Sequence, residues 1–534
     1  MQSGQPIIIL KENVERNYGK EAQRSNIAAA KAIAGAVKST LGPRGMDKML
    51  VGSTGDIVIT NDGATILGEI AVQHPGAKMV IEVAKTQDDE VGDGTTTAVI
   101  IVGALMEQAE GMLEQGIHPT VIAQGYLMGM DKALEIVNSL SLHVEPTDRK
   151  TLFKIVDTAI TGKSIESVKT KLDGIIVDAV MAVAEKTNGK IAVDEDDVMI
   201  KKQKGQAIDD AELIRGIVID KKRISESMPK RVTKAKVALV ATPLEITKTQ
   251  VKAKIKITSA EQINAFSEQE RDTLKKLADA IIDSGAKVLL CQKGIADPVQ
   301  FYLAKNGIFA IEDVPESDMK YAARSLHANI VNKPDSLTGK DLGYADLVEE
   351  DTDANITRIS GCKNPKSITI LLRGSSDYLL DELERAVVDG KRVVMDAMED
   401  GTYVVGGGAV ETELLMKIRD YASTVGGRVQ LAIEAYASAF ESIPRTLAEN
   451  SGYNPIDKLV ELKNAHSKGK KYSGLNVYEG TVIDMLGEGV LEPLRSKRQS
   501  IQSATETAVM LVRVDDMMIT QSKSSGPGSA PAMQ

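Results

Sequence analysis

The chain has 534 residues, and a usual domain size of roughly 100 to 200 residues predicts about three or four domains. Its formal net charge of −10 argues against a general nucleic-acid-binding protein, which would carry a basic face. With no Trp, 5 Phe and 12 Tyr, the cores must be filled by aliphatic residues and by the 20 Met, which favours closely packed helices.

Cysteine usage and hydropathy bear on the compartment. The two cysteines, Cys291 and Cys362, cannot form a disulfide framework, which indicates a reducing environment. The N-terminal segment "MQSGQPIIILKENVERNYGK" has only a short apolar run, unlike a signal peptide, and no stretch approaches the roughly 18 apolar residues of a membrane span. We therefore expect a soluble cytoplasmic protein without a membrane segment.

Residues from Glu21 to about Leu142 have the pattern of helices interrupted once. The Ala-rich run "NIAAAKAIAGAVKSTL" has helical spacing, and "LGPRG" (residues 41–45) ends it with Gly and Pro. "DIVITNDG" (residues 56–63) predicts a short strand that runs into a turn. The sequence after this turn, and again after Thr97, predicts helices.

From about Val237 the pattern changes to α/β. Short apolar runs such as "VALVAT", "KVLLCQKG" and "GIFAIEDV" alternate with helical segments such as "ERDTLKKLADAIIDSG". "VKAKIKI" (residues 251–257) predicts a strand with one lysine-lined face, and a helix is expected after Ser259. Residues from about Val405 to Met518 are again largely helical, and the Gly/Pro/Ser-rich tail predicts disorder.

The common nucleotide and metal motifs are missing. "TGKS" (residues 161–164) resembles the end of a P-loop, but the earlier glycine that a P-loop requires is replaced by Asp157, and no GxGxxG occurs. The five His and two Cys have no zinc-ligand spacing.

Four Gly-rich or Asp-containing turns remain as candidates for chemistry. They are "TLGPRG", "TNDG" with Asp62, "GDGTTT" with Asp93, and "VGGGAVE". Glycines let backbone N–H groups approach an anion, and a helix N-terminus attracts phosphate. A carboxylate beside phosphate requires a cation between them, which suggests Mg²⁺. Taken singly, "LGPRG" is typical of a helix C-cap and turn, "TNDG" of a plain turn and "GGG" of a flexible joint, whereas "GDGTTT" has more threonines than a cap needs. Only their conjunction favours a nucleotide site.

Six segments carry a resemblance to a known family. "TLGPRGMDKML", "TNDGATIL", "GDGTTTAV", "GGGAVE", "IPRTLAENSG" and "GLNVYEG" resemble group II chaperonins, which comprise the archaeal thermosomes and the eukaryotic cytosolic chaperonin TRiC. The match covers the chain except its tail, and it is most similar to a thermosome subunit.

The resemblance implies a multidomain α and α/β chaperonin fold. A mainly helical equatorial ATP-binding domain would comprise residues 1–147 and 404–534, and an α/β intermediate domain residues 148–216 and 368–403. An α/β apical domain would comprise residues 217–367. Its helical protrusion, about residues 244–271, would act as a built-in lid; a solvated surface hairpin is the alternative.

The resemblance also assigns residues. Asp93 would coordinate Mg²⁺, Asp62 would lie beside the γ-phosphate, and Asp389 would orient or activate the attacking water. Lys163 would sense the γ-phosphate, or else be an exposed loop lysine. The remaining assignments are Leu41, Gly42 and Pro43 as nucleotide contacts, Gly94, Thr95, Thr96 and Thr97 on the phosphates, Gly407 packing on the nucleotide, and Gly474, Asn476 and Glu492 on the base and ribose.

The function that the resemblance implies is an ATP-dependent chaperone with ATP and Mg²⁺ as ligands. Two stacked rings of eight or nine identical or paralogous subunits would enclose non-native proteins, without a separate co-chaperonin lid. The rival interpretations are a small-molecule kinase or phosphotransferase and a holdase that binds ATP without hydrolysing it. Two departures from the family stand out: Gly390-Lys391 after Asp389, which predicts a weaker helix there, and a tail without Gly-Gly-Met repeats.

Overall fold

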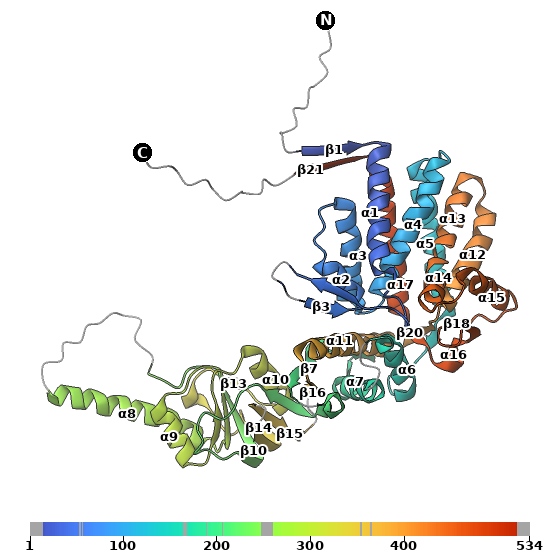
Figure 1. Cartoon of the computed structure of the whole chain (residues 1–534). Helices are drawn as coiled ribbons and strands as arrows, with labels where there is room; N and C mark the ends of the chain where they lie inside the picture. Colours follow the sequence, from blue (N-terminus) through green and yellow to red (C-terminus); the bar gives the residue numbers. More distant parts are fainter. Residues whose placement is uncertain are drawn as a thin grey trace, which may run out of the picture. The chain divides into compact units, whose positions relative to one another are not determined.

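The computed structural model describes residues 14–520, except 53–54, 56, 164–167, 188, 206, 247–259, 353–354 and 364–365. The chain forms two compact units (Figure 1). Unit 1 comprises residues 1–145, 150–166 and 400–534, and unit 2 comprises residues 146–149 and 167–399. Both ends of the chain therefore build unit 1, and unit 2 is formed by the segment between them.

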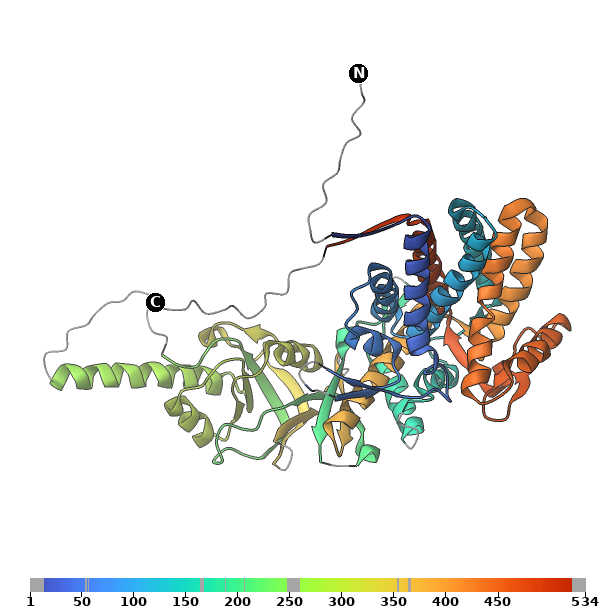
Figure 2. The same ribbon diagram turned by 45° about the horizontal axis from the view of Figure 1, so that its top comes forward.

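Unit 1 is a bundle of long helices that run side by side (Figures 1 and 2). One continuous core of Ala, Val, Ile, Leu and Met joins them, as the aromatic-poor composition predicts. Three buried aromatic residues of this core, Tyr126, Tyr436 and Phe440, pack in series with ring centroids 5.6 and 5.3 Å apart, the first pair tilted and the second edge-to-face. The bundle helices are α1 (Lys20–Lys38), α3 (Pro75–Val91), α4 (Thr95–Glu114), α5 (Pro119–Leu140), α12 (Ala409–Val425), α13 (Gly427–Ala439) and α17 (Leu494–Arg513).

Shorter elements of unit 1 connect the ends of these helices. The antiparallel pairs are β1 (Val14–Tyr18) with β21 (Asp516–Thr520), β2 (Lys48–Val51) with β3 (Ile57–Thr60), and β18 (Ser473–Asn476) with β19 (Thr481–Asp484). A three-stranded sheet joins β4 (Leu142–His143), β17 (Thr402–Val405) and β20 (Leu491–Pro493). The short helices are α2 (Gly63–Glu69), α14 (Ser442–Asn450), α15 (Pro455–Ser467) and α16 (Met485–Glu488), and α6 (Arg149–Ile160) belongs to unit 1 from residue 150 onward.

The larger sheet of unit 2 has helices on both faces. Side chains of β10 (Arg231–Val240) alternate between them: Val237 and Leu239 join one core with α10 (Glu316–Leu326), whereas Ala238 and Val240 join another with α8 (Ala260–Asp283) and α9 (Asp297–Lys305). The strand order is β12-β11-β10-β14-β15-β9, and β13 also pairs with β10. The remaining strands are β9 (Gly216–Ile219), β11 (Val288–Cys291), β12 (Phe309–Ile311), β13 (Ile330–Val331), β14 (Gly343–Asp351) and β15 (Ile356–Ser360).

A second sheet of unit 2 is built around β16 (Ile368–Gly374), in which every residue is buried. β16 pairs in parallel with β7 (Val198–Lys204) and antiparallel with β8 (Glu212–Ile214). The other elements of unit 2 are α7 (Lys169–Val183), the hairpin of β5 (Glu185–Thr187) and β6 (Lys190–Ala192), α11 (Asp377–Asp400), and the 3₁₀ turns Glu195–Asp197, Ile208–Asp210 and Pro334–Ser336.

The order of helical, α/β and helical segments predicted from the sequence is confirmed. The predicted weakness at Gly390-Lys391 is wrong, because α11 continues through both residues. Lys391 is buried there, and its ammonium lies 3.1 Å from the carbonyl oxygen and 3.3 Å from the carboxylate of Glu195, which anchors the helix.

Other expectations are not tested by the described residues. The predicted strand at 251–257 and the tail both lie outside them, although a helix does begin at Ala260. The division into equatorial, intermediate and apical domains stays a prediction beside the two units observed. No helix in the described part of the chain is long and apolar enough to cross a membrane.

Candidate functional site

The N-terminus of α4 has no side-chain cap. Gly94 is its N-cap residue, with φ 80° and ψ 12°, and the first bond of the helix runs from the Ala98 N–H to the Gly94 carbonyl at 2.9 Å. The N–H groups of Thr95, Thr96 and Thr97 precede this first bond, so the helix itself cannot satisfy them. Three threonines thus start a helix without capping it, and the amides that the helix leaves unpaired define a candidate anion site of the kind that binds phosphate.

Asp93 is held at this helix end by its main chain. Its carbonyl oxygen accepts hydrogen bonds from the side-chain amide of Gln87 (2.6 Å) and from the hydroxyl of Ser496 (3.3 Å). Among the described residues, no hydrogen bond or ion pair engages the half-buried Asp93 carboxylate. That oxygen donor suits Mg²⁺, and it stands beside amides that suit the phosphates whose oxygens would complete the coordination.

The described residues contain no group of three or more His, Cys, Asp or Glu side chains that could hold a metal ion. A cation bound with a nucleotide needs no such group, because Mg²⁺ usually takes one or two carboxylates and completes its shell with phosphate oxygens and water. The donor set at Asp93 therefore fits a nucleotide-bound Mg²⁺.

Asp62 is the N-cap of α2. Its carboxylate accepts hydrogen bonds from the Thr65 N–H at 2.7 Å and the Ala64 N–H at 3.4 Å, which fixes its orientation. The next residue, Gly63, lies so close to α4 that a Cβ atom built on it would stand 2.5 Å from the Thr96 hydroxyl. The structure thus brings the Asp62 turn against the threonines of the anion site.

The loop after α1 is clamped by α14. The side-chain amide of Asn450 donates to the carbonyls of Lys38 and Leu41, at 3.1 and 2.9 Å. A Cβ on Gly42 would meet the Leu447 side chain at 2.5 Å. The position of Leu41, Gly42 and Pro43 is therefore set by a helix about 400 residues further along the chain.

The segment before Lys163 packs on this loop. A Cβ built on Gly162 would lie 2.9 Å from the Pro43 Cα, and the Gly162 carbonyl accepts a hydrogen bond from the Asn61 side chain at 2.6 Å. Lys163 is half-buried next to it. The loops that carry Pro43, Asp62 and Lys163 thus meet in unit 1.

A second helix begins with an uncapped glycine. Gly408, with φ 81°, is the N-cap of α12 and offers no side chain. The preceding Gly407 carbonyl accepts the Leu475 N–H at 2.9 Å and would lie 2.7 Å from a Cβ on Gly474. Asn476 ends the same strand, and its side-chain oxygen accepts the N–H groups that follow it in the β18–β19 turn.

Glu492 belongs to a buried charged cluster. The Lys497 ammonium lies 2.8 Å from the Glu492 carboxylate and 2.7 Å from the Glu411 carboxylate. Burial raises the pKa of Glu492; Lys497 opposes this shift, while the negative charges of Glu411 and Asp93 add to it. Burial alone would lower the pKa of Lys497, but the two carboxylates outweigh it and raise that pKa. Because the negative charge of Asp93 raises the pKa of Glu492, this cluster is coupled electrostatically to the candidate anion site.

Asp389 differs from the other predicted residues in its place in the fold. It is half-buried in the middle of α11 and belongs to unit 2, whereas all the other predicted site residues belong to unit 1. The structure therefore collects the predicted nucleotide contacts in unit 1, from segments at both ends of the chain.

Several supporting residues were missed by the sequence reasoning. Gln87 and Lys497 fix loops of the site, and neither lies in a motif that marks it as functional. Asn61 also fixes a loop of the site; it lies in the candidate turn "TNDG", but no role was assigned to it there. Asn450 could have been found from the sequence, because it lies in "IPRTLAENSG", one of the segments that resemble the family, and is the last residue of α14.

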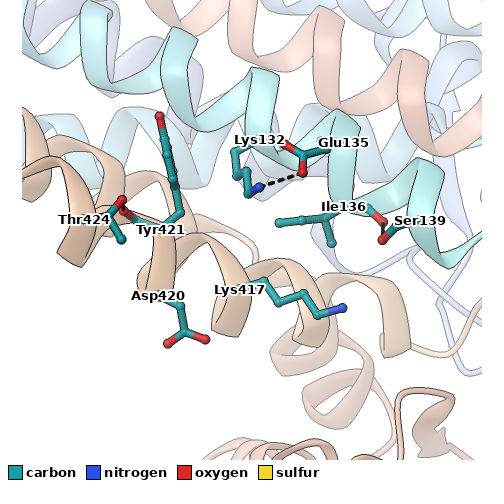
Figure 3. Close-up of a pocket in the computed structure, with 8 residues that line it drawn as sticks. All are labelled: Lys132, Glu135, Ile136, Ser139, Lys417, Asp420, Tyr421 and Thr424. Atoms are coloured by element: carbon teal, nitrogen blue, oxygen red, sulfur yellow. Dashed lines mark hydrogen bonds and ion pairs between the residues drawn. The ribbon is translucent and has the colours of Figure 1, made fainter.

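A separate open groove of 460 Å³ lies between α5 and α12 (Figure 3). The ion pair between Lys132 and Glu135 borders it, and Lys417 and Tyr421 face it from α12. None of the predicted site residues lines this groove.

The chain is similar to proteins of one family along almost its whole length. The model of the TCP-1/cpn60 chaperonin family matches residues 33–522. The thermosome subunit alpha of Archaeoglobus fulgidus is 52% identical over 98% of this chain and 97% of its own length. The thermosome subunit of Pyrococcus abyssi is 51% identical over 97% of this chain and 95% of its own length.

A solved structure supports the same assignment. The open-state monomer of a group II chaperonin from Methanococcoides burtonii is 41% identical and superimposes with a TM-score of 0.60, covering 79% of this chain and all of that one. The chain therefore belongs to the TCP-1/cpn60 chaperonin family, and within it to the group II chaperonins of the thermosome type.

Proposed function

We propose that this group II chaperonin subunit hydrolyses ATP and uses the energy to close a folding chamber around non-native proteins. The observation that carries the proposal is the uncapped N-terminus of α4, which presents three backbone amides beside the Asp93 carboxylate and the Asp62 turn. Such an arrangement suits a triphosphate with a divalent cation better than it suits a neutral metabolite.

The residues of unit 1 would bind the nucleotide. The amides and hydroxyls of Thr95, Thr96 and Thr97 would hold phosphate oxygens, with Gly94 allowing their close approach, and Asp93 would hold Mg²⁺. Bound Mg²⁺ would neutralise phosphate charge during hydrolysis. The nucleotide would further be bound by Leu41, Gly42 and Pro43, by Gly407, by Lys163 at the γ-phosphate, and by Gly474, Asn476 and Glu492 at the base and ribose.

Hydrolysis would depend on two carboxylates. Asp62 is oriented by its cap bonds to α2, so a remaining lone pair can accept a hydrogen bond from the attacking water. Asp389 would complete the alignment of that water or take its proton. Because Asp389 belongs to unit 2, the proposal makes hydrolysis conditional on the approach of the two units, and this couples the reaction to a conformational change.

The assembly we propose consists of two stacked rings of eight or nine identical or paralogous subunits in the cytoplasm. Its clients would be non-native proteins with exposed apolar surface, and the segment 244–271 would supply the lid, so no separate co-chaperonin is needed. Support comes from the similarity to thermosome subunits and, for the compartment, from the two buried free cysteines, Cys291 and Cys362.

Replacing Asp389 by Ala tests the proposal. We expect the assembled Asp389→Ala variant to bind ATP as the wild type does, while its rate of phosphate release falls roughly 10²- to 10⁴-fold, the usual contribution of a general base. The matched control is Asp381→Ala, which removes an exposed carboxylate of the same helix paired with Lys202 and should leave turnover unchanged.

The outcomes separate the alternatives. Normal turnover in Asp389→Ala would remove this residue from its role. A wild type that binds ATP without releasing phosphate would be a holdase, and transfer of the phosphate to a metabolite would identify a kinase; either result would contradict the proposal.

A further inference from the structure

His466 is a buried histidine whose two ring nitrogens are both engaged. It lies in the last turn of α15, and its side chain has no exposed surface. Nδ1 lies 2.6 Å from a carboxylate oxygen of Glu413 on α12, and Nε2 lies 2.7 Å from the carbonyl oxygen of Ser473 in β18.

Both neighbours of the ring can only accept hydrogen bonds. The second oxygen of Glu413 is 2.9 Å from the Lys417 ammonium, and this cation favours the ionised carboxylate. Burial alone would raise the pKa of Glu413, but the hydrogen bonds from His466 and Lys417 outweigh it and lower that pKa. The Ser473 carbonyl has no proton to give. A neutral imidazole carries one N–H and would leave one contact between two acceptors, so only the imidazolium satisfies both.

The place of His466 in its helix favours the same charge state. The carbonyl groups at the C-terminus of a helix stabilise a cation in its last turn. Two other charged groups of the neighbouring elements have partners of their own: Glu441 pairs with Lys463 of α15 at 2.6 Å, and Asp484, opposite Ser473 in the β18–β19 ladder, caps α16 through the Leu486 N–H.

The contacts of His466 connect β18 with α12 at the part of the candidate site that is predicted to bind the base and ribose. Ser473 directly precedes Gly474, and Leu475 donates to the Gly407 carbonyl. Glu413 lies on α12, about one turn after the glycines that begin this helix. β18 is therefore attached to the start of α12 at two points, through Leu475 and Gly407 and through His466 and Glu413.

We propose that His466 is a positioning residue which, as an imidazolium, holds residues 474–476 against Gly407 and thereby makes the affinity for the adenosine part of the nucleotide depend on one buried proton. This inference rests on the proposed function, which assigns the base and ribose to Gly474, Asn476 and Glu492. The predicted phosphate site at α4 makes none of these contacts, so its affinity for phosphate does not depend on the protonation of His466.

The charge state is tested on the wild-type particle. Solid-state NMR of protein labelled with ¹⁵N-histidine distinguishes a ring with two protonated nitrogens from a neutral ring with one. The chain has five His, and the His466→Gln difference spectrum identifies the signals. If that variant does not fold, replacing His74, His118, His143 and His327 leaves His466 alone in the spectrum. We expect two protonated nitrogens at neutral pH; one bare nitrogen would overturn the inference.

The effect on the site is tested with two ligands, Mg·ADP and Mg·tripolyphosphate. We expect His466→Gln to weaken Mg·ADP about tenfold or more, as for the loss of a hydrogen bond to a charged group, and to leave Mg·tripolyphosphate unchanged. Raising the pH until the imidazolium is lost should weaken Mg·ADP in the wild type and not in His466→Gln. The control is His143→Gln, which replaces an exposed histidine of the same unit that pairs with Glu145, and it should bind both ligands as the wild type does.

The failures are distinguishable. Equal Mg·ADP affinity in the wild type and in His466→Gln would overturn the inference and leave the proposed function standing. A wild type that binds neither ligand would overturn the proposed function and, with it, the role of His466 in affinity.

Discussion

Gly94 combines a backbone requirement with a steric one. Its φ of 80° lies in the left-handed region, which costs a residue with a Cβ roughly 1–2 kcal/mol. A Cβ at this position would also stand 2.9 Å from the Ser496 hydroxyl and 3.1 Å from the Ser500 hydroxyl. The glycine therefore lets the chain enter α4 with free amides while α17 packs directly behind it.

We predict that Gly94→Ala lowers the free energy of unfolding by about 1–3 kcal/mol and weakens Mg·tripolyphosphate binding, because the new methyl group displaces α17 or the loop. Urea unfolding and calorimetry measure the two effects. Gly111→Ala is the control: Gly111 lies in the same helix with nothing within 4 Å of its Cβ position, so this change should be neutral or stabilising by up to about 1 kcal/mol. Identical behaviour of the two variants would contradict the role of Gly94.

At the scale of elements, one buried lysine joins three of them. Lys497 of α17 pairs with both Glu411 of α12 and Glu492 of β20, and all three side chains are largely withdrawn from solvent. Removing one partner of a buried pair is expensive because the remaining charge stays buried without compensation. Charge pairing thus holds α12, α17 and β20 together at the candidate site, whereas apolar packing holds the core of the bundle together.

We predict that Lys497→Met lowers the free energy of unfolding at neutral pH by about 3–5 kcal/mol. The penalty should shrink in acid. A carboxyl group with a raised pKa in the folded state contributes stability that is present below its unfolded pKa of about 4.3 and is lost as the pH rises through the folded pKa. Lys497 limits the rise in the pKa of Glu492, so without Lys497 more stability should be lost as the pH rises. Unfolding measured from pH 4 to pH 8 checks the trend.

The control for this prediction is an exposed pair of the same unit. Lys38 lies 2.7 Å from Glu449, and both side chains are more than a third exposed. Lys38→Met should cost no more than about 1 kcal/mol at any of these pH values. A penalty for Lys497→Met that is equally small, or that does not depend on pH, would show that the buried cluster is not the constraint described.

At the scale of the whole molecule, the two cysteines report on one unit only. Cys291 and Cys362 are both buried in unit 2, and unit 1 has none. Burial raises the pKa of Cys291 to about 11 and that of Cys362 to about 12. The native thiols are therefore shielded and protonated, and thiol chemistry becomes a selective probe for the opening of unit 2.

We predict that native protein reacts slowly with a thiol reagent at pH 8 and that two thiols per chain react once urea unfolds unit 2. A thiol with a raised folded pKa contributes stability below its unfolded pKa of about 8.5 that is lost as the pH rises toward the folded value. The urea midpoint followed by labelling should therefore fall above about pH 8.5. Rapid labelling of both thiols in native buffer would contradict the burial; Cys362→Ala reports Cys291 alone.

The secondary-structure elements of this chain could be predicted from local sequence patterns. Helical spacing around residues 26–41, the α/β alternation after Val237 and the turn chemistry at Asp62 and Gly94 all predict the elements observed, because spacing, capping and left-handed turns are properties of neighbouring residues. The resemblance to the family assigned the predicted site residues, including Asp389, and these assignments stay predictions.

Tertiary structure decided what holds these elements together. The contacts of Asn450 with Leu41, of the His466 ring with Glu413 and of Lys497 with Glu411 join residues 53 to 409 positions apart, and no periodicity in the sequence encodes such pairs. The continuity of α11 through Gly390 likewise depends on the burial of Lys391 against Glu195. Propensity sets the elements, whereas long-range packing and buried charge pairing set which of them meet, and these depend on the folded chain as a whole.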